Sequence, residues 1–254
     1  MPSQPSRFAL FAEILPAIRF VWQARQRLWL PGGILLLTEL PLFLYQAQAS
    51  QGSGRNLPWL TVLLLLTLIN MLINIAVMRL YHDEPAQAWR LHRLDQTTRG
   101  AFWVMCKQVV AIMLASMLLI IPLVALGQLA KKMGVPAPAE EIVLTVLLGL
   151  LPSMLNARLL LALPARLDQR SQPFGVAWRL SRGQLLPLTL FGLGFSLLDK
   201  LPTLSHPVLT RWVPANGSCY YLLVLALCVL LAWLEMIKVI LQIRCYNRLA
   251  RPAP

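Results

Sequence analysis

The chain has 254 residues, of which 57% are apolar and 13% are charged. This composition argues against an ordinary soluble globular domain, which carries about 25% charged residues, and favours one integral membrane domain covering residues 1–254. A net charge of +13 would indicate nucleic-acid binding in a soluble protein. Basic residues that flank membrane spans instead set topology and meet anionic headgroups, so we expect no nucleic-acid partner.

Six apolar stretches predict an all-α, polytopic membrane protein with six transmembrane helices. About 20 apolar residues in a helix cross a hydrocarbon core of about 30 Å. The first stretch contains Glu39 and two prolines, and the fifth has only 14 residues, so either could instead be re-entrant. The stretches are Leu28–Tyr45, Leu57–Met78, Val109–Leu126, Ile142–Leu163, Leu185–Leu198 and Tyr220–Leu234, the last continuing past Glu235 to Ile243.

The end of the first stretch resembles a signal-peptidase site, Ala47-Gln48-Ala49. The region before the stretch is long and contains Glu13, however, and the stretch itself contains Glu39. These features favour a retained membrane anchor.

Lys and Arg residues are distributed unevenly among the segments that the six spans separate. The first segment and every second segment after it contain 18 of the 23 basic residues, and the other segments contain 5. Positive residues accumulate in cytoplasmic loops. The split predicts six spans with both termini in the cytoplasm. Removing the first or the fifth span would destroy the alternation of basic-rich and basic-poor segments.

Residues 173–184, PFGVAWRLSRGQ, predict an amphipathic helix that lies in the cytoplasmic interface. Trp178 would lie at headgroup depth, with Arg179 and Arg182 turned toward phosphates. Two other segments show a similar pattern: Pro85–Phe102 contains Trp89, and a helical stripe near the start ends at Trp22. Each precedes two spans, so the chain divides into three helix-plus-hairpin units, 1–80, 81–163 and 164–250.

The segment LLLALPARLDQRSQPFGVAWRLSRGQLLPL, followed by a final hairpin and the basic tail IRCYNRLARP, resembles the YciC-like inner-membrane proteins of Gram-negative bacteria. That family is related to the membrane domain of some glycerophosphodiester phosphodiesterases. The likeness covers residues 145–250 best and includes Ala177, Arg179 and Ser181 after Pro164. It implies a multi-pass helical protein of the bacterial inner membrane without established catalysis.

Polar residues inside the spans are the candidates for an intramembrane site, because burying them in lipid is costly. Glu39 and Asn70 both approach the midplane, and Asn74 shares a helical face with Asn70. These three residues either bind a solute or proton or form a packing contact between helices. Glu235 and Lys238 lie near the cytoplasmic end of the last span, where an i, i+3 pair can neutralise itself.

Catalytic and cofactor signals are lacking in the sequence. His82, Asp83, Glu84 and His92 do not have metal-ligand spacing, and there is no nucleophile elbow or phosphate-binding glycine loop. We therefore expect neither an enzyme nor a metal or cofactor, but an envelope protein that contacts anionic lipids or a membrane-protein partner. The alternative is a transporter of a small solute or lipid. The predicted lipid-interface residues are Trp22, Trp89, Trp178, Arg179 and Arg182.

The charge distribution gives a topology that reporter fusions can test. Fusions after Gln51, Gly134 and Pro207 should report periplasm. Fusions after Gln96, Ser171 and Pro254 should report cytoplasm. A cytoplasmic signal at Pro207 would remove the fifth span and the three-unit organisation with it.

Overall fold

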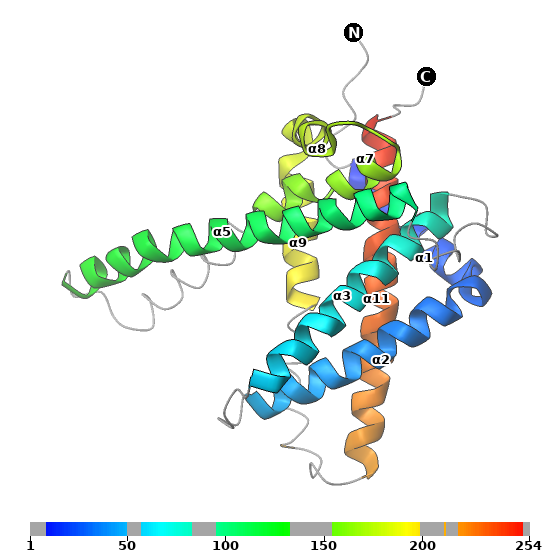
Figure 1. Ribbon diagram of the computed structural model, residues 1–254, viewed down its shortest axis with the longest axis horizontal. Helices are drawn as coiled ribbons and strands as arrows, with labels where there is room; N and C mark the ends of the chain where they lie inside the picture. The colour runs from blue at the N-terminus through cyan, green and yellow to red at the C-terminus, as the bar shows by residue number, and fades with distance from the viewer. Residues whose placement is uncertain are drawn as a thin grey trace.

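The fold is helical wherever it is described. In the computed structural model (Figure 1), the described residues are 9–49, 57–82, 95–132, 154–198, 211 and 218–250. They form helices joined by short turns and include no strand, which confirms the predicted all-α class.

The helix α11 (Ser218–Ala250) is the element on which most others pack. Figure 1 shows it running through the height of the molecule, with α2 (Arg25–Ala49) and α3 (Leu57–His82) lying against it. The short helices α1 (Ile14–Gln23) and α7 (Ala162–Leu167) contact its C-terminal half. The core between these helices contains fully buried apolar side chains, among them Leu35, Ile75, Leu161, Leu188 and Ile240.

Three of the described helices are long and apolar enough to cross a membrane, which makes this a membrane-embedded protein. The qualifying stretches are Leu64–Tyr81 in α3, Gln96–Leu119 in α5 (Gln96–Lys132) and the whole of α11. They overlap the second, third and sixth predicted spans.

Two weaker predicted spans also lie in helices. The first lies within α2, which continues through Pro31 and Pro41, and the fifth has the same bounds as α9 (Leu185–Leu198). Neither helix is among the three that meet the length and apolarity criterion.

The fourth predicted span differs from a single helix at its end. Its first part lies outside the described residues; residues 154–159 are helical, the chain turns at Leu160 and Leu161, and α7 follows. Pro164 explains the turn, because proline has no N–H to donate to the carbonyl of Leu160 and its ring crowds that carbonyl. The prediction of a continuous helix through Leu163 was therefore wrong.

Two Arg-Gly pairs, Arg99-Gly100 and Arg182-Gly183, lie in the described residues and have different conformations. Helix α8 (Pro173–Ser181) starts at a proline and is joined to α9 by a 3₁₀ turn, η3 (Arg182–Gln184). Arg99 and Gly100 lie inside α5 instead. The predicted interfacial segment around Trp89 is largely outside the described residues.

Asp95 caps the start of α5. Its Oδ1 accepts a hydrogen bond from the backbone N–H of Thr98 at 2.7 Å, and its Oδ2 pairs with Arg79 Nη1 at 2.9 Å. Burial tends to raise the pKa of Asp95, but these hydrogen bonds and the Arg79 charge outweigh it and hold the pKa below its ordinary value. The cap thus ties the start of α5 to the end of α3.

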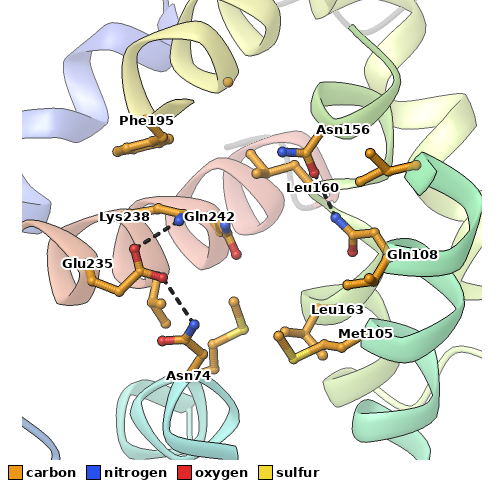
Figure 2. Close-up of a pocket in the computed structure, with 15 residues that line it drawn as sticks. Asn74, Met105, Gln108, Asn156, Leu160, Leu163, Phe195, Glu235, Lys238 and Gln242 are labelled. Carbon is orange, nitrogen blue, oxygen red and sulfur yellow. Dashed lines mark hydrogen bonds and ion pairs between the residues drawn. The ribbon is translucent and has the colours of Figure 1, made fainter. Parts of the chain in front are cut away.

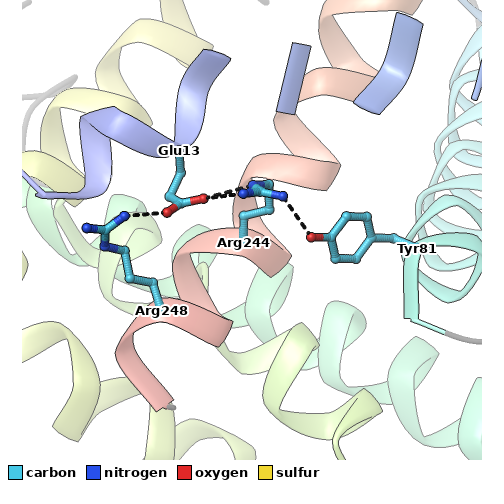
Figure 3. Close-up of polar contacts among 4 residues, drawn as sticks. All are labelled: Glu13, Tyr81, Arg244 and Arg248. Atoms are coloured by element: carbon cyan, nitrogen blue, oxygen red, sulfur yellow. Dashed lines mark hydrogen bonds and ion pairs between the residues drawn. The ribbon is translucent and has the colours of Figure 1, made fainter. Parts of the chain in front are cut away.

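An ion-pair cluster joins the N-terminal segment to the C-terminal end of α11 (Figure 3). Glu13, the last residue of η1 (Ala9–Glu13), accepts from Arg244 at 2.8 Å and also pairs with Arg248. Arg244 donates to the Tyr81 hydroxyl at 3.1 Å. The Glu13 side chain is 11% exposed, so water screens these contacts only partly. Glu13 therefore ties η1 to α11, and Arg244 extends the cluster to α3.

Replacing Glu13 should loosen this end of the molecule. We expect Glu13→Gln to lower the free energy of unfolding in detergent by about 2 kcal/mol, because hydrogen bonds to charged groups contribute about 1.5–3 kcal/mol. Arg19→Gln is the control, since Arg19 is exposed on α1 next to this cluster, forms no ion pair among the described residues and should change stability little. Equal effects of the two substitutions in denaturant melts would contradict a special role for Glu13.

Candidate functional site

A polar cavity of about 280 Å³ lies between α3, α5, α9 and α11 (Figure 2). Most of its wall is apolar, with Met105, Leu160, Leu163 and Phe195 among the lining residues. Its polar lining side chains are Asn74, Gln108, Asn156, Glu235, Lys238 and Gln242.

Hydrogen bonds order most of these polar groups in two sets. Glu235 pairs with Lys238 at 2.8 Å and accepts a hydrogen bond from Asn74 Nδ2 at 3.1 Å. The predicted i, i+3 pair therefore forms. On the other wall, Gln108 Nε2 donates to Asn156 Oδ1 at 2.9 Å (Figure 2).

One acceptor at the cavity is unused. Within the described structure, the buried Oδ1 of Asn74 accepts no hydrogen bond. A buried polar atom without a partner costs about 1–3 kcal/mol. A water molecule or a donor group of a ligand would relieve that cost.

Glu235 lies close to the middle of α11, so the depth of the cavity depends on which part of that helix crosses the membrane. Glu235 lies about 26 Å along α11 from Ser218 at 1.5 Å per residue. A hydrocarbon core is about 30 Å thick. A span that begins at Ser218 therefore places the Glu235–Lys238 pair near the opposite boundary, where a charged pair is less costly than at the midplane.

Of the three polar residues predicted as one site, only Asn74 lines this cavity. Asn74 lines the cavity in Figure 2, whereas Glu39 and Asn70 do not. Glu39 lies on α2 between Leu36 and Leu40, which pack against Tyr220, Val224 and Cys228 on α11. Asn70 is one helical turn before Asn74, and its Oδ1 is also buried without a hydrogen bond in the described structure.

Gln108 and Gln242 are cavity residues that the sequence prediction missed. Glu235, Lys238 and Gln242 are spaced three and four residues apart, so they share one face of α11. This spacing could have identified Gln242. Gln108 gives a weaker signal, because it follows Lys107 at the edge of an apolar run.

Trp22, which was predicted as a lipid-interface residue, is exposed on α1. Ala17 and Val21 are buried, while Trp22 is exposed on the opposite side of the helix. The guanidinium of Arg25 lies 5.3 Å from the centroid of the Trp22 ring, and that ring lies 6.1 Å from the ring of Trp233. Trp22 therefore presents an aromatic face next to a positive charge.

Trp178 on α8 has a similar arrangement. Its ring is partly exposed and lies 4.2 Å from the guanidinium carbon of Arg158. Arg179 and Arg182 are also exposed. Ser181, one turn after Trp178, is buried. The predicted interface residue Trp89 lies outside the described residues.

Comparison of the chain with protein-family models, with curated proteins and with solved structures found no match. The chemistry must be read from the side chains. The cavity offers a carboxylate, an ammonium group and four carboxamides, which donate and accept hydrogen bonds. These groups are suited to holding a small polar or zwitterionic molecule.

Charge replacement separates packing from binding at the cavity. We expect Lys238→Met to lower the free energy of unfolding by about 2 kcal/mol, because it leaves Glu235 partly buried without its cation. The double variant Lys238→Met/Glu235→Leu should recover most of that loss, as removing both charges restores compatibility with the apolar surroundings. Chemical denaturation in detergent measures both. Failure of the double variant to recover would show that the pair does more than neutralise itself.

Proposed function

We propose that this chain is a non-enzymatic bacterial inner-membrane protein that binds anionic lipids through its cytoplasmic face. The proposal includes six spans, both termini in the cytoplasm and three interfacial helices. A membrane-protein partner bound at the same face is compatible with it. The resemblance to YciC-like proteins supports a location in the bacterial inner membrane.

The two tryptophan–arginine pairs carry the proposal. Tryptophan is enriched at membrane boundaries because its ring is apolar and its N–H is polar. Arginine beside it meets lipid phosphates with several donors. Trp22 has Arg25 at its ring, and Trp178 has Arg158.

Each pair includes or contacts a residue that is close in the chain to a cavity residue. Trp22 contacts Trp233, which precedes Glu235 by two residues, and Arg158 follows the cavity residue Asn156 by two. The level of Glu235 is about 26 Å from the start of α11, close to the thickness of a hydrocarbon core of about 30 Å. With a span that begins at Ser218, this distance supports a headgroup position for Trp22.

A second candidate function is binding or transport of a small solute or lipid. The polar cavity of about 280 Å³ and the unused acceptor of Asn74 favour it. The cavity also holds the Glu235–Lys238 pair, which would attract the opposite charges of a zwitterion. If Glu235→Gln abolished solute transport and left the lipid preference unchanged, this second function would be favoured over the first.

Vesicle binding of α8 variants tests the lipid proposal. The full chain is reconstituted, and its preference for phosphatidylglycerol over phosphatidylcholine is measured. Arg179→Gln with Arg182→Gln should weaken that preference by about 2 kcal/mol at most, since each basic residue near the surface contributes about 1 kcal/mol. High salt should mask the difference.

Tryptophan fluorescence measures the depth of Trp178 in the bilayer and serves as the control for the vesicle experiment. In a variant whose other tryptophans are replaced, lipid-borne quenchers at shallow depth should reach Trp178. A Trp178 that no lipid quencher reaches, together with an unchanged lipid preference of the double variant, would refute the proposal.

A further inference from the structure

A groove separates the first turns of α5 from the start of α8. Its volume is about 430 Å³, and we call it the α5–α8 groove. Its charged lining residues are Lys107 on α5 and Arg166 on α7, and its aromatic ones are Trp103 and Phe174. The remaining lining residues are Gly100, Val104, Ser171, Gln172, Pro173 and Gly175.

The two cations of this groove lack acidic partners in the described structure. Arg79, Lys238 and Arg244 each pair with a carboxylate. Lys107 and Arg166 form no ion pair among the described residues, and no lining residue is acidic. Their positive charge is therefore available to an anion.

Gly100 fixes where the Arg166 side chain lies. A β-carbon added at Gly100 would overlap the Arg166 guanidinium, so this side chain lies directly against the backbone of α5. Glycine at this position lets a cation occupy the floor of the groove. Because the overlapping atoms are the end of a flexible side chain, an alanine here would move Arg166 without disrupting the helix.

The start of α8 adds a second source of positive potential. Pro173 is its first residue, and the preceding Gln172 makes no side-chain capping hydrogen bond. The first N–H groups of a helix and its dipole favour a negative charge. Phosphate is a frequent ligand at such a position.

An apolar stripe on α5 continues from the groove. Trp103 and Lys107 are followed at intervals of three or four residues by Val110, Leu114, Met117 and Ile121, so all lie on one helix face. Each of these apolar side chains is more than half exposed. A free phosphate would use only the cations, whereas a phospholipid would also cover the stripe.

We infer that the α5–α8 groove binds the phosphodiester of an anionic phospholipid between Lys107 and Arg166, with an acyl chain along the exposed face of α5. The inference rests on the proposed lipid-binding function and names a discrete site for it. Trp103 would flank the headgroup at the membrane boundary. The lipid charge would neutralise two cations that have no partner in the described structure.

Lipid retention by the purified full chain tests the site. The protein is equilibrated with equal amounts of phosphatidylglycerol and phosphatidylcholine, and bound lipids are counted by native mass spectrometry. Lys107→Gln with Arg166→Gln should lower the bound ratio of the two lipids, by about fivefold for each cation removed. Gly100→Ala should also lower it, because it displaces Arg166 while keeping both charges. Lys132→Gln, the same charge change near the other end of α5, should leave the ratio unchanged.

Two results would overturn the inference. One is an unchanged ratio in both the double variant and Gly100→Ala, each checked for normal unfolding. The other is displacement of the lipid by excess inorganic phosphate, which would make the occupant a free anion. The groove variants could leave the lipid ratio unchanged while Arg179→Gln/Arg182→Gln lowers the preference for phosphatidylglycerol vesicles. That combination would support the proposed lipid-binding function and exclude this groove as its site.

Discussion

Charged groups at the C-terminal half of α11 constrain the arrangement of the other helices. A charge near an apolar medium is tolerated when a partner compensates the lost hydration. Glu235 pairs with Lys238 and accepts a hydrogen bond from Asn74. Arg244 pairs with Glu13 and donates a hydrogen bond to Tyr81. Tyr246 donates to Asp168 near the end of α7. These contacts draw α3, η1 and the end of α7 to α11, so this one helix organises both the packing and the polar contacts.

Local features of the fold were readable from the sequence, and distant ones were not. The length of apolar runs gave the positions of α3, α5 and α11, and the i, i+3 spacing gave the Glu235–Lys238 pair. Pro164 carried the signal for the break at Leu160. These features depend on residues within one or two turns of each other.

The choice of partner for Asn74 depends on rotation of whole helices. Asn74 and Glu235 are separated by 161 positions in the chain, and Glu13 and Arg248 by 235. An almost uniformly apolar helix has no marked polar face to fix its rotation, as α3 and α11 illustrate. Glu39 was therefore as reasonable a partner for an asparagine of α3 as Glu235 was. A unique pairing emerges only when all helices pack around α11.

The balance of charges gives the strongest reason to look for lipid phosphates. The chain has 23 Lys and Arg residues but only 10 Asp and Glu residues. Among the described residues, Glu13 pairs with two arginines, and Asp95, Asp168 and Glu235 each pair with a cation. The net charge of +13 leaves cations for anions outside the chain, and a membrane surface supplies such anions as headgroups. Cations paired to carboxylates hold helices together, while those beside Trp22, beside Trp178 and in the α5–α8 groove are the ones that we propose meet lipid.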